Sequence, residues 1–166
     1  MGMDGNYLRV TQEELERALD DPNGFREETQ DRLDDLADAD LPPEEARYLT
    51  THKAWHAIAF LLGRAEFHVD VVHGEGEIAE EEDWGYGPPR YLSADQVESA
   101  AEALAVLDFD ELLDSTDPND LTEADVYPLT WDEEDALEWV GHWFKPIPAF
   151  FSAAAEKGDS MILWID

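Results

Sequence analysis

The segment GYGPPR at 85–90 holds the residues whose types and spacing best suit chemistry. Its two glycines permit backbone angles that other residues avoid, and its two prolines stiffen the chain directly before Arg90. A helix is predicted to begin after Ser93, and a guanidinium beside a helix N-terminus is a suitable anion site. With Tyr86 and Tyr91 as neighbours, the segment predicts a pocket for a small carboxylate or phosphate. The alternative is a rigid turn in which Arg90 pairs with one of the many acids of the chain.

His56 is the candidate catalytic residue, because an imidazole titrates near neutral pH and can act as a general acid or base. Catalysis requires His56 to converge with Tyr86 and Arg90 on one bound molecule. We expect Tyr127 and Trp131, from the string DVYPLTW, to line the same cleft. The competing interpretation is structural: a hydrogen-bonded core histidine and packed core aromatics.

No metal site or cofactor is predicted. His52 and His56 share one face of a predicted helix, but the zincin glutamate is missing and Lys53 would repel a cation. The acidic run at 75–83 lacks the EF-hand order of ligands and is interpreted as a solvated loop. The chain also contains no Gly-x-Ser-x-Gly turn, phosphate loop or dinucleotide fingerprint.

Helices must position most of these residues. Apolar spacing, capping boxes and Gly/Pro breaks predict helices behind Thr11, across about 25–40, across about 50–62, behind Ser93, at 132–144 and from Pro146 onward. Thr130 and Glu133 form one of these capping boxes. Strands are predicted at 6–10, 67–72 and 161–165, and short turns at 108–128. On a strand at 67–72, His68 and His73 would point to opposite faces. The expected fold class is α+β, or mixed α/β: a small sheet with several packed helices in one compact domain spanning 1–166.

Charge and composition exclude several classes of function. The 166 residues include 42 Asp plus Glu and 10 Lys plus Arg, a net charge of −32, with no cysteine. A hydrophobic fraction of 43% is too high for a disordered acidic tail. The scattered cations form no basic stripe, so we predict neither nucleic-acid nor membrane binding. No signal peptide or spanning segment is visible, which predicts a cytoplasmic protein.

The acidity itself has two explanations. Either the chain is adapted to molar salt, or it mimics a polyanion to neutralise a basic partner. Only three lysines occur, Lys53, Lys145 and Lys157, and the acids spread from Asp4 to Asp166. Uniform spread and scarce lysine favour salt adaptation, because a Debye length of roughly 3 Å at 1 M salt nearly abolishes self-repulsion.

Five strings resemble the YfbM-like family of bacterial and archaeal domains of unknown function. They are MGMDGNYLRVTQEELERAL at the start, KAWHAIAFLLG at 53–63, GYGPPRYLSADQV at 85–97, DVYPLTW at 125–131 and FKPIPAFFSAAAEKGDSMILWID at the end. The resemblance spans almost the whole chain and implies a small single-domain α+β protein. It implies no reaction, so the function must be argued from the residues.

Three functions remain open. The first is a non-enzymatic binding or interaction protein, which predicts an apolar patch of several hundred Å² outside the core. The second is a hydrolase or transferase acting on a small anionic substrate in a cleft formed by the GYGPPR segment and His56. The third is an acidic immunity or inhibitor protein. The expected partner is accordingly a small anionic ligand or an unidentified protein, and the oligomeric state is left open.

Overall fold

The fold is an α+β domain built on one antiparallel sheet. A computed structural model describes residues 2–78, 84–128 and 131–166. Its elements are, in chain order, β1 (Gly5–Val10), α1 (Gln12–Asp20), α2 (Pro22–Asp38), β2 (Tyr48–His52), α3 (Trp55–Arg64), β3 (Gly76–Glu77), β4 (Arg90–Leu92), α4 (Ala94–Val106), α5 (Phe109–Asp114), α6 (Pro118–Glu123), α7 (Ala136–Phe144), α8 (Ile147–Glu156) and β5 (Ser160–Ile165). No helix in this described part of the chain is long and apolar enough to cross a membrane.

The sheet joins the two ends of the sequence. Its strand order is β2-β1-β5-β4-β3, and every neighbouring pair is antiparallel. The central strands β1 and β5 pair with Tyr7 opposite Leu163 and Leu8 opposite Ile162. Because helices cover both faces, β5 is apolar at successive positions and β1 is buried along its whole length. The predicted strands at 6–10 and 161–165 are therefore confirmed.

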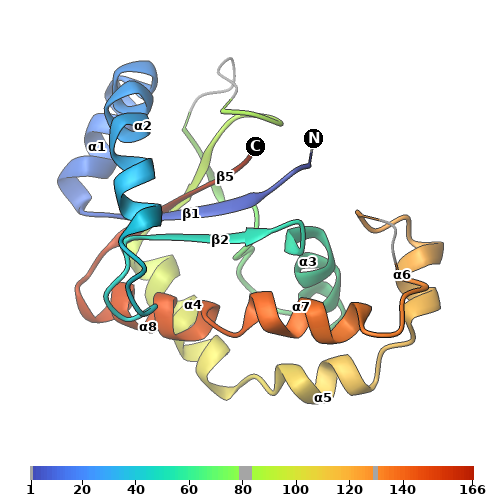
Figure 1. Cartoon of the computed structure of the whole chain (residues 1–166). Helices are drawn as coiled ribbons and strands as arrows, with labels where there is room; N and C mark the ends of the chain where they lie inside the picture. Colours follow the sequence, from blue (N-terminus) through green and yellow to red (C-terminus); the bar gives the residue numbers. More distant parts are fainter. Residues whose placement is uncertain (1, 79–83, 129–130) are drawn as a thin grey trace.

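Two hydrophobic cores lie on opposite faces of the sheet. Tyr7 and Leu163 face the larger core, which packs against α3, α4, α7 and α8. Leu8 and Ile162 face the smaller core, which α1 and α2 cover. In Figure 1, α1 and α2 stand on one side of the strands and the remaining helices lie on the other. Side chains alternate along each strand, so neighbouring residues serve different cores.

Two glycines allow close backbone approaches beside the candidate site. A Cβ on Gly5 would lie 2.7 Å from Cβ of Trp55, so only glycine lets β1 pass α3 so closely. Gly85 has a φ of +145°, and a Cβ there would lie 2.5 Å from Cα of Asp166. The chain before β4 is therefore held against the end of β5.

Several predicted elements differ from the structure. Residues 67–72 form no strand: Oδ1 of Asp70 accepts hydrogen bonds from the backbone N–H groups of Val72 and His73, which turns the chain. The alternating pattern there arises because Val69 and Val71 of an irregular segment are buried. The prediction of one helix at 50–62 was wrong at its start, because residues 48–52 form β2 and α3 begins only at Trp55.

Other boundaries also shift. Residues 108–128 contain the short helices α5 and α6 rather than turns alone. The helix predicted at 132–144 begins at Ala136, and the capping box proposed for it includes Thr130, which lies outside the described residues. The capping boxes at Thr11 and Ser93 are confirmed.

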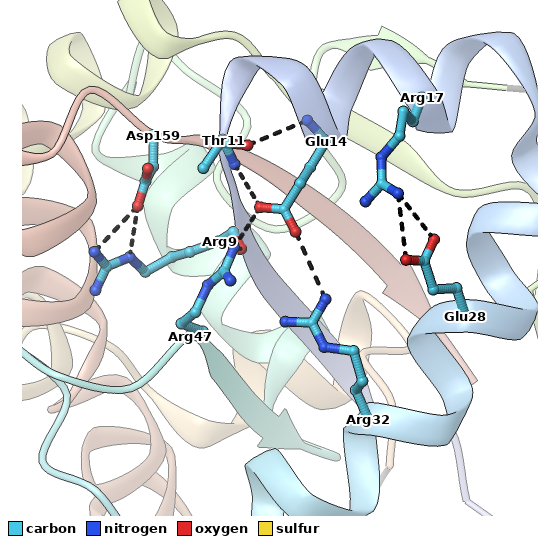
Figure 2. A network of polar contacts seen from close by, with 8 residues as sticks. All are labelled: Arg9, Thr11, Glu14, Arg17, Glu28, Arg32, Arg47 and Asp159. Carbon is cyan, nitrogen blue, oxygen red and sulfur yellow. Dashed lines mark hydrogen bonds and ion pairs between the residues drawn. The ribbon is translucent and has the colours of Figure 1, made fainter.

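The half-buried Arg47 and the exposed Arg32 link α1 to the chain before β2 and to α2. Figure 2 shows Glu14 between Arg47 and Arg32, with Oε1 2.6 Å from Nη2 of Arg47 and Oε2 3.6 Å from Nη1 of Arg32. Burial alone would raise the pKa of Glu14, but hydrogen bonds from the Thr11 backbone and Arg47 outweigh it and lower the pKa. These cations therefore have internal carboxylate partners despite the excess of acids.

Candidate functional site

His56 lies in the first turn of α3 and is held by the chain beyond α6. Its Nδ1 accepts a hydrogen bond of 2.9 Å from the backbone N–H of Tyr127. Its ring stacks on Trp55, with centroids 5.0 Å apart and an interplanar angle of 12°. The structure thus joins His56 and Tyr127 by a hydrogen bond.

The N-terminal segment contacts the cluster formed by Trp55, His56 and Tyr127. The indole N–H of Trp55 donates to the carbonyl of Met3 at 2.9 Å, and the N–H of Met3 donates to the hydroxyl of Tyr127 at 2.9 Å. A Cβ on Gly2 would meet the end of the Lys53 side chain and the hydroxyl of Tyr127. Most polar atoms of the cluster are therefore occupied by the fold itself.

The environment of His56 favours its neutral form. Burial makes the larger contribution to lowering the pKa of His56, and the nearby His73 lowers it further. Because Nδ1 accepts a hydrogen bond, the proton of the neutral ring resides on Nε2. His56 is accordingly a fixed hydrogen-bond donor at neutral pH rather than a ready general base.

This geometry predicts a pH dependence. The folded pKa of His56 lies below its ordinary value of 6.5, so the unfolded state binds more protons as the pH falls. The free energy of unfolding should therefore decrease as the pH is lowered past about 6.5. His56→Asn should remove the contribution of His56 to this decrease, while its Oδ1 still accepts the hydrogen bond from the Tyr127 N–H. His56→Ala leaves the Tyr127 N–H without an acceptor and should cost about 1–3 kcal/mol.

Urea unfolding of both variants at about pH 7.5 and 5.5 measures the two effects, since few carboxylates titrate in that window. Equal pH dependence of the wild-type protein and His56→Asn would contradict this assignment. An NMR titration that places the pKa of His56 above its ordinary value would contradict it as well.

Arg90 lies on the hairpin formed by β3 and β4. Its Nη2 donates to the carbonyl of Glu75 at 3.1 Å, and its Nη1 lies 3.9 Å from Oε1 of Glu77. In the described part of the chain, no hydrogen bond, ion pair or ring contact joins Arg90 to His56 or to Tyr86. The guanidinium is held to its own hairpin by a backbone carbonyl.

The other predicted residues of this loop lie apart from one another. Tyr86 is 55% exposed, and its backbone N–H donates to the carbonyl of Ile165 at 2.7 Å. Tyr91 faces the smaller core, on the opposite side of the sheet from Leu92. Gly85 and Gly87 have positive φ values, as the sequence suggested. These tyrosines therefore point to different surroundings.

Trp131 is a core residue. Its side chain is 1% exposed, and its indole N–H donates to the carbonyl of Val126 at 2.8 Å. It also contacts the ring of Trp139 at a centroid distance of 6.3 Å. This hydrogen bond holds Trp131 against Val126, the residue before Tyr127.

The histidines do not gather around a metal. His52 lies at the end of β2 with a φ of +48° and contacts the ring of Trp143, so it does not share a helix face with His56. Among the residues that the structure describes, no group of three or more potential ligands could hold a metal ion. The acidic run at 75–83 lies partly outside these residues.

A groove lies between α5 and α7. It has a volume of about 690 Å³. Phe109 and Phe144, stacked with centroids 3.7 Å apart, line it together with Leu113. A Cβ on Gly141 would lie 2.9 Å from Cδ1 of Leu113, so this glycine lets α7 approach α5.

Val106 stands at the edge of this groove with 86% of its surface exposed. Val106 also lines a second hollow, of about 390 Å³, together with Leu107 and Leu112. The side chains of Asp108, Asp110, Glu138, His142 and Lys145 complete the first hollow, and Glu111 borders the second. The two hollows and the exposed Val106 that lines both of them form one surface groove. We call it the Val106 groove.

Comparison with known proteins shows which family the chain belongs to. The family described as "Domain of unknown function (DUF1877)" matches residues 1–164. The chain belongs to this family. The crystal structure of a protein of unknown function, YfbM from Escherichia coli, is similar with a TM-score of 0.64 and 20% identity, covering 98% of this chain and 99% of that chain. None of the curated proteins compared with the chain matches it significantly.

These findings confirm the resemblance to YfbM and the α+β fold for this DUF1877 member. At 20% identity the structural likeness shows the fold alone. The family description names no reaction, ligand or partner.

Sequence reasoning missed several polar contacts in this DUF1877 domain. Nε2 of His68 lies 2.7 Å from Oγ of Ser99, and Nδ1 of His73 lies 3.3 Å from Oδ2 of Asp70. The pKa of Asp70 is lowered: burial raises it, but hydrogen bonds from His73 and Val72 outweigh burial. A strand at 67–72 would place Asp70 and His73, three residues apart, on opposite faces, so the strand prediction gave no signal for their contact.

Proposed function

We propose that this protein is a non-enzymatic interaction domain that docks a basic, amphipathic segment of a partner protein in the Val106 groove. The observation that carries the proposal is the 86% exposure of Val106, which lines both hollows together with other apolar residues. An amphipathic helix commonly lays its apolar face into such a groove. Adaptation to high salt, which the composition favours, is part of the same proposal.

Charge complementarity supports a basic occupant. Asp108, Asp110, Glu111 and Glu138 border the two hollows, against a single ammonium from Lys145. A partner segment with Lys or Arg beside its apolar residues would meet this rim favourably. A second copy of this chain would instead bring a further net charge of −32 to the surface.

The enzyme alternative, a hydrolase or transferase with a small anionic substrate, has weaker support. Nδ1 of His56 is occupied by the Tyr127 N–H, and the lowered pKa leaves the ring neutral. Arg90 is bonded to the carbonyl of Glu75. An immunity or inhibitor protein would use the same groove, and blocked activity of a bound partner would identify that role.

The test is the affinity for a cationic amphipathic peptide of leucine and lysine, measured by fluorescence anisotropy in about 1 M KCl, where nonspecific attraction is screened. Val106→Asp should weaken binding by about tenfold or more, because it places a charge in the apolar contact. Leu41→Asp is the matched control, since Leu41 is also an exposed large hydrophobic residue, at 48%. It should leave the affinity unchanged.

Equal affinities of Val106→Asp and Leu41→Asp would overturn the proposal. Equal binding of a leucine-and-glutamate peptide would overturn its charge argument. Both substitutions replace exposed side chains, so loss of folding should not obscure the comparison.

A further inference from the structure

We propose that the basic residue of the partner segment in the Val106 groove is an arginine, bound by the carboxylate of Glu138. This inference rests on the proposed function and specifies the partner of the same groove. Glu138 lies in the first turn of α7 and lines the hollow of about 690 Å³. It is exposed, and in the part of the chain that the structure describes its side chain makes no hydrogen bond or ion pair. Its carboxylate is therefore free to bind a side chain of the partner.

The other carboxylates of this hollow differ from Glu138 in role. Oδ1 of Asp108 accepts a hydrogen bond of 3.0 Å from the backbone N–H of Glu111 and caps α5. Asp110 borders the hollow from α5 and adds to its negative potential. Glu138 is the carboxylate that α7 contributes to the lining. It is thus the acceptor on the wall formed by Phe144 and its helix.

Lys145 borders the same hollow but does not neutralise Glu138. The two residues are seven positions apart, which is about 10 Å along a helix axis. The Debye length in about 1 M salt is roughly 3 Å, so a charge at that separation is screened. Lys145 is instead the C-cap of α7, where a cation interacts favourably with the helix carbonyls. The carbonyl of His142 lacks its usual i+4 donor there, because Pro146 has no N–H.

The ion pairs within the chain show which cation its carboxylates bind. Among the described residues, arginine supplies the cation in every ion pair except that of His73, and none of the three lysines takes part. Arg17 with Glu28 and Arg64 with Asp120 are pairs on the surface, at 3.2 and 3.1 Å. Nη1 of Arg17 contacts both carboxylate oxygens of Glu28. An unpaired glutamate on a neighbouring helix offers the same kind of acceptor to a guanidinium from outside.

High salt increases the advantage of arginine over lysine. An ammonium is strongly hydrated and attracts a carboxylate as a point charge, whereas a guanidinium is weakly hydrated and can donate two parallel hydrogen bonds. Screening in about 1 M salt weakens the point-charge attraction more than direct hydrogen bonds. The flat guanidinium also packs on aromatic rings, and Phe109 and Phe144 line the same hollow. Arginine is therefore the cation that suits both the carboxylate and the apolar wall.

The experiment compares a leucine-and-arginine peptide with the leucine-and-lysine peptide of equal length, by fluorescence anisotropy in about 1 M KCl. The arginine peptide should bind the wild-type protein about fivefold to tenfold more tightly. Glu138→Gln should reduce this preference to about twofold or less, because the amide keeps the shape of the side chain but loses the charge-assisted hydrogen bonds. Glu102→Gln is the matched control, at an exposed glutamate of α4 outside both hollows, and should keep the preference.

The outcomes separate this inference from the proposed function. If both peptides bind in a way that depends on Val106 but with equal affinities, the arginine assignment is wrong and the groove remains. If the preference for arginine persists in Glu138→Gln, the role of Glu138 is wrong. If neither peptide binds, or if Val106→Asp changes neither affinity, the proposed function fails and this inference fails with it. Glu138 and Glu102 are both exposed, so loss of folding should not obscure the comparison.

Discussion

Replacing Asp159 by alanine should lower the free energy of unfolding by about 3–5 kcal/mol, because it leaves a buried guanidinium without its counter-charge. Arg9 lies in the central strand β1, with its side chain 7% exposed. Both Nε and Nη2 of Arg9 bond Oδ2 of Asp159, at 3.2 and 3.1 Å (Figure 2). Nη1 donates to the carbonyl of Ala46, so the cation cannot turn toward water without breaking further contacts.

The matched control is an exposed pair in the same region. Arg17 and Glu28 lie 3.2 Å apart and both side chains are 49% exposed. Glu28→Ala should therefore cost no more than about 1 kcal/mol. Urea unfolding at one high salt concentration measures both variants. Similar losses of unfolding free energy for Asp159→Ala and Glu28→Ala would show that the buried Arg9–Asp159 pair contributes no more to stability than an exposed pair.

Lowering the salt concentration from about 2 M to 0.1 M KCl should destabilise the wild-type protein by several kcal/mol, a large share of the roughly 5–15 kcal/mol usual for a domain. The Debye length grows from a few Å to about 10 Å over this range, so carboxylates that are screened at high salt repel one another. The net charge of −32 makes that repulsion large for a chain of this length. Thermal unfolding at several KCl concentrations measures the effect.

A charge-reduced variant separates repulsion from the general effect of salt on apolar burial. Four exposed acids of α2, Glu27, Asp31, Asp34 and Asp35, can be changed to their amides. Their removal should make the melting temperature less dependent on salt. An unchanged salt dependence would assign the effect to hydrophobic burial instead. Full stability of the wild-type protein at low salt would contradict salt adaptation.

Local sequence patterns correctly predicted the helices that are stabilised by contacts between residues close in the sequence. The capping boxes at Thr11 and Ser93 locate α1 and α4 correctly, because their hydrogen bonds span only three residues. Residues 48–52 could not be assigned in this way. They become a strand only because β1 offers a partner edge, and that pairing depends on residues about 40 positions away.

The same distinction between local signals and long-range packing applies to the candidate site. Side-chain chemistry selected His56 and the string DVYPLTW selected Tyr127, and the fold joins the two residues by a hydrogen bond. The sequence could not reveal that Nδ1 of His56 is used by a backbone N–H, or that Val106 lines two hollows. The groove beside Val106 depends on the packing of α5 against α7 and on Gly141, for which a single sequence carries no signal.

The most direct test of the proposed interaction domain is a map of the methyl and indole NMR resonances upon addition of the cationic amphipathic peptide in about 1 M KCl. Shifts are expected at Val106, Leu107 and Leu113, which line the groove, and none at Trp55 beside His56. Shifts centred on Trp55, or the absence of shifts at Val106, would contradict the assignment of the Val106 groove as the binding surface.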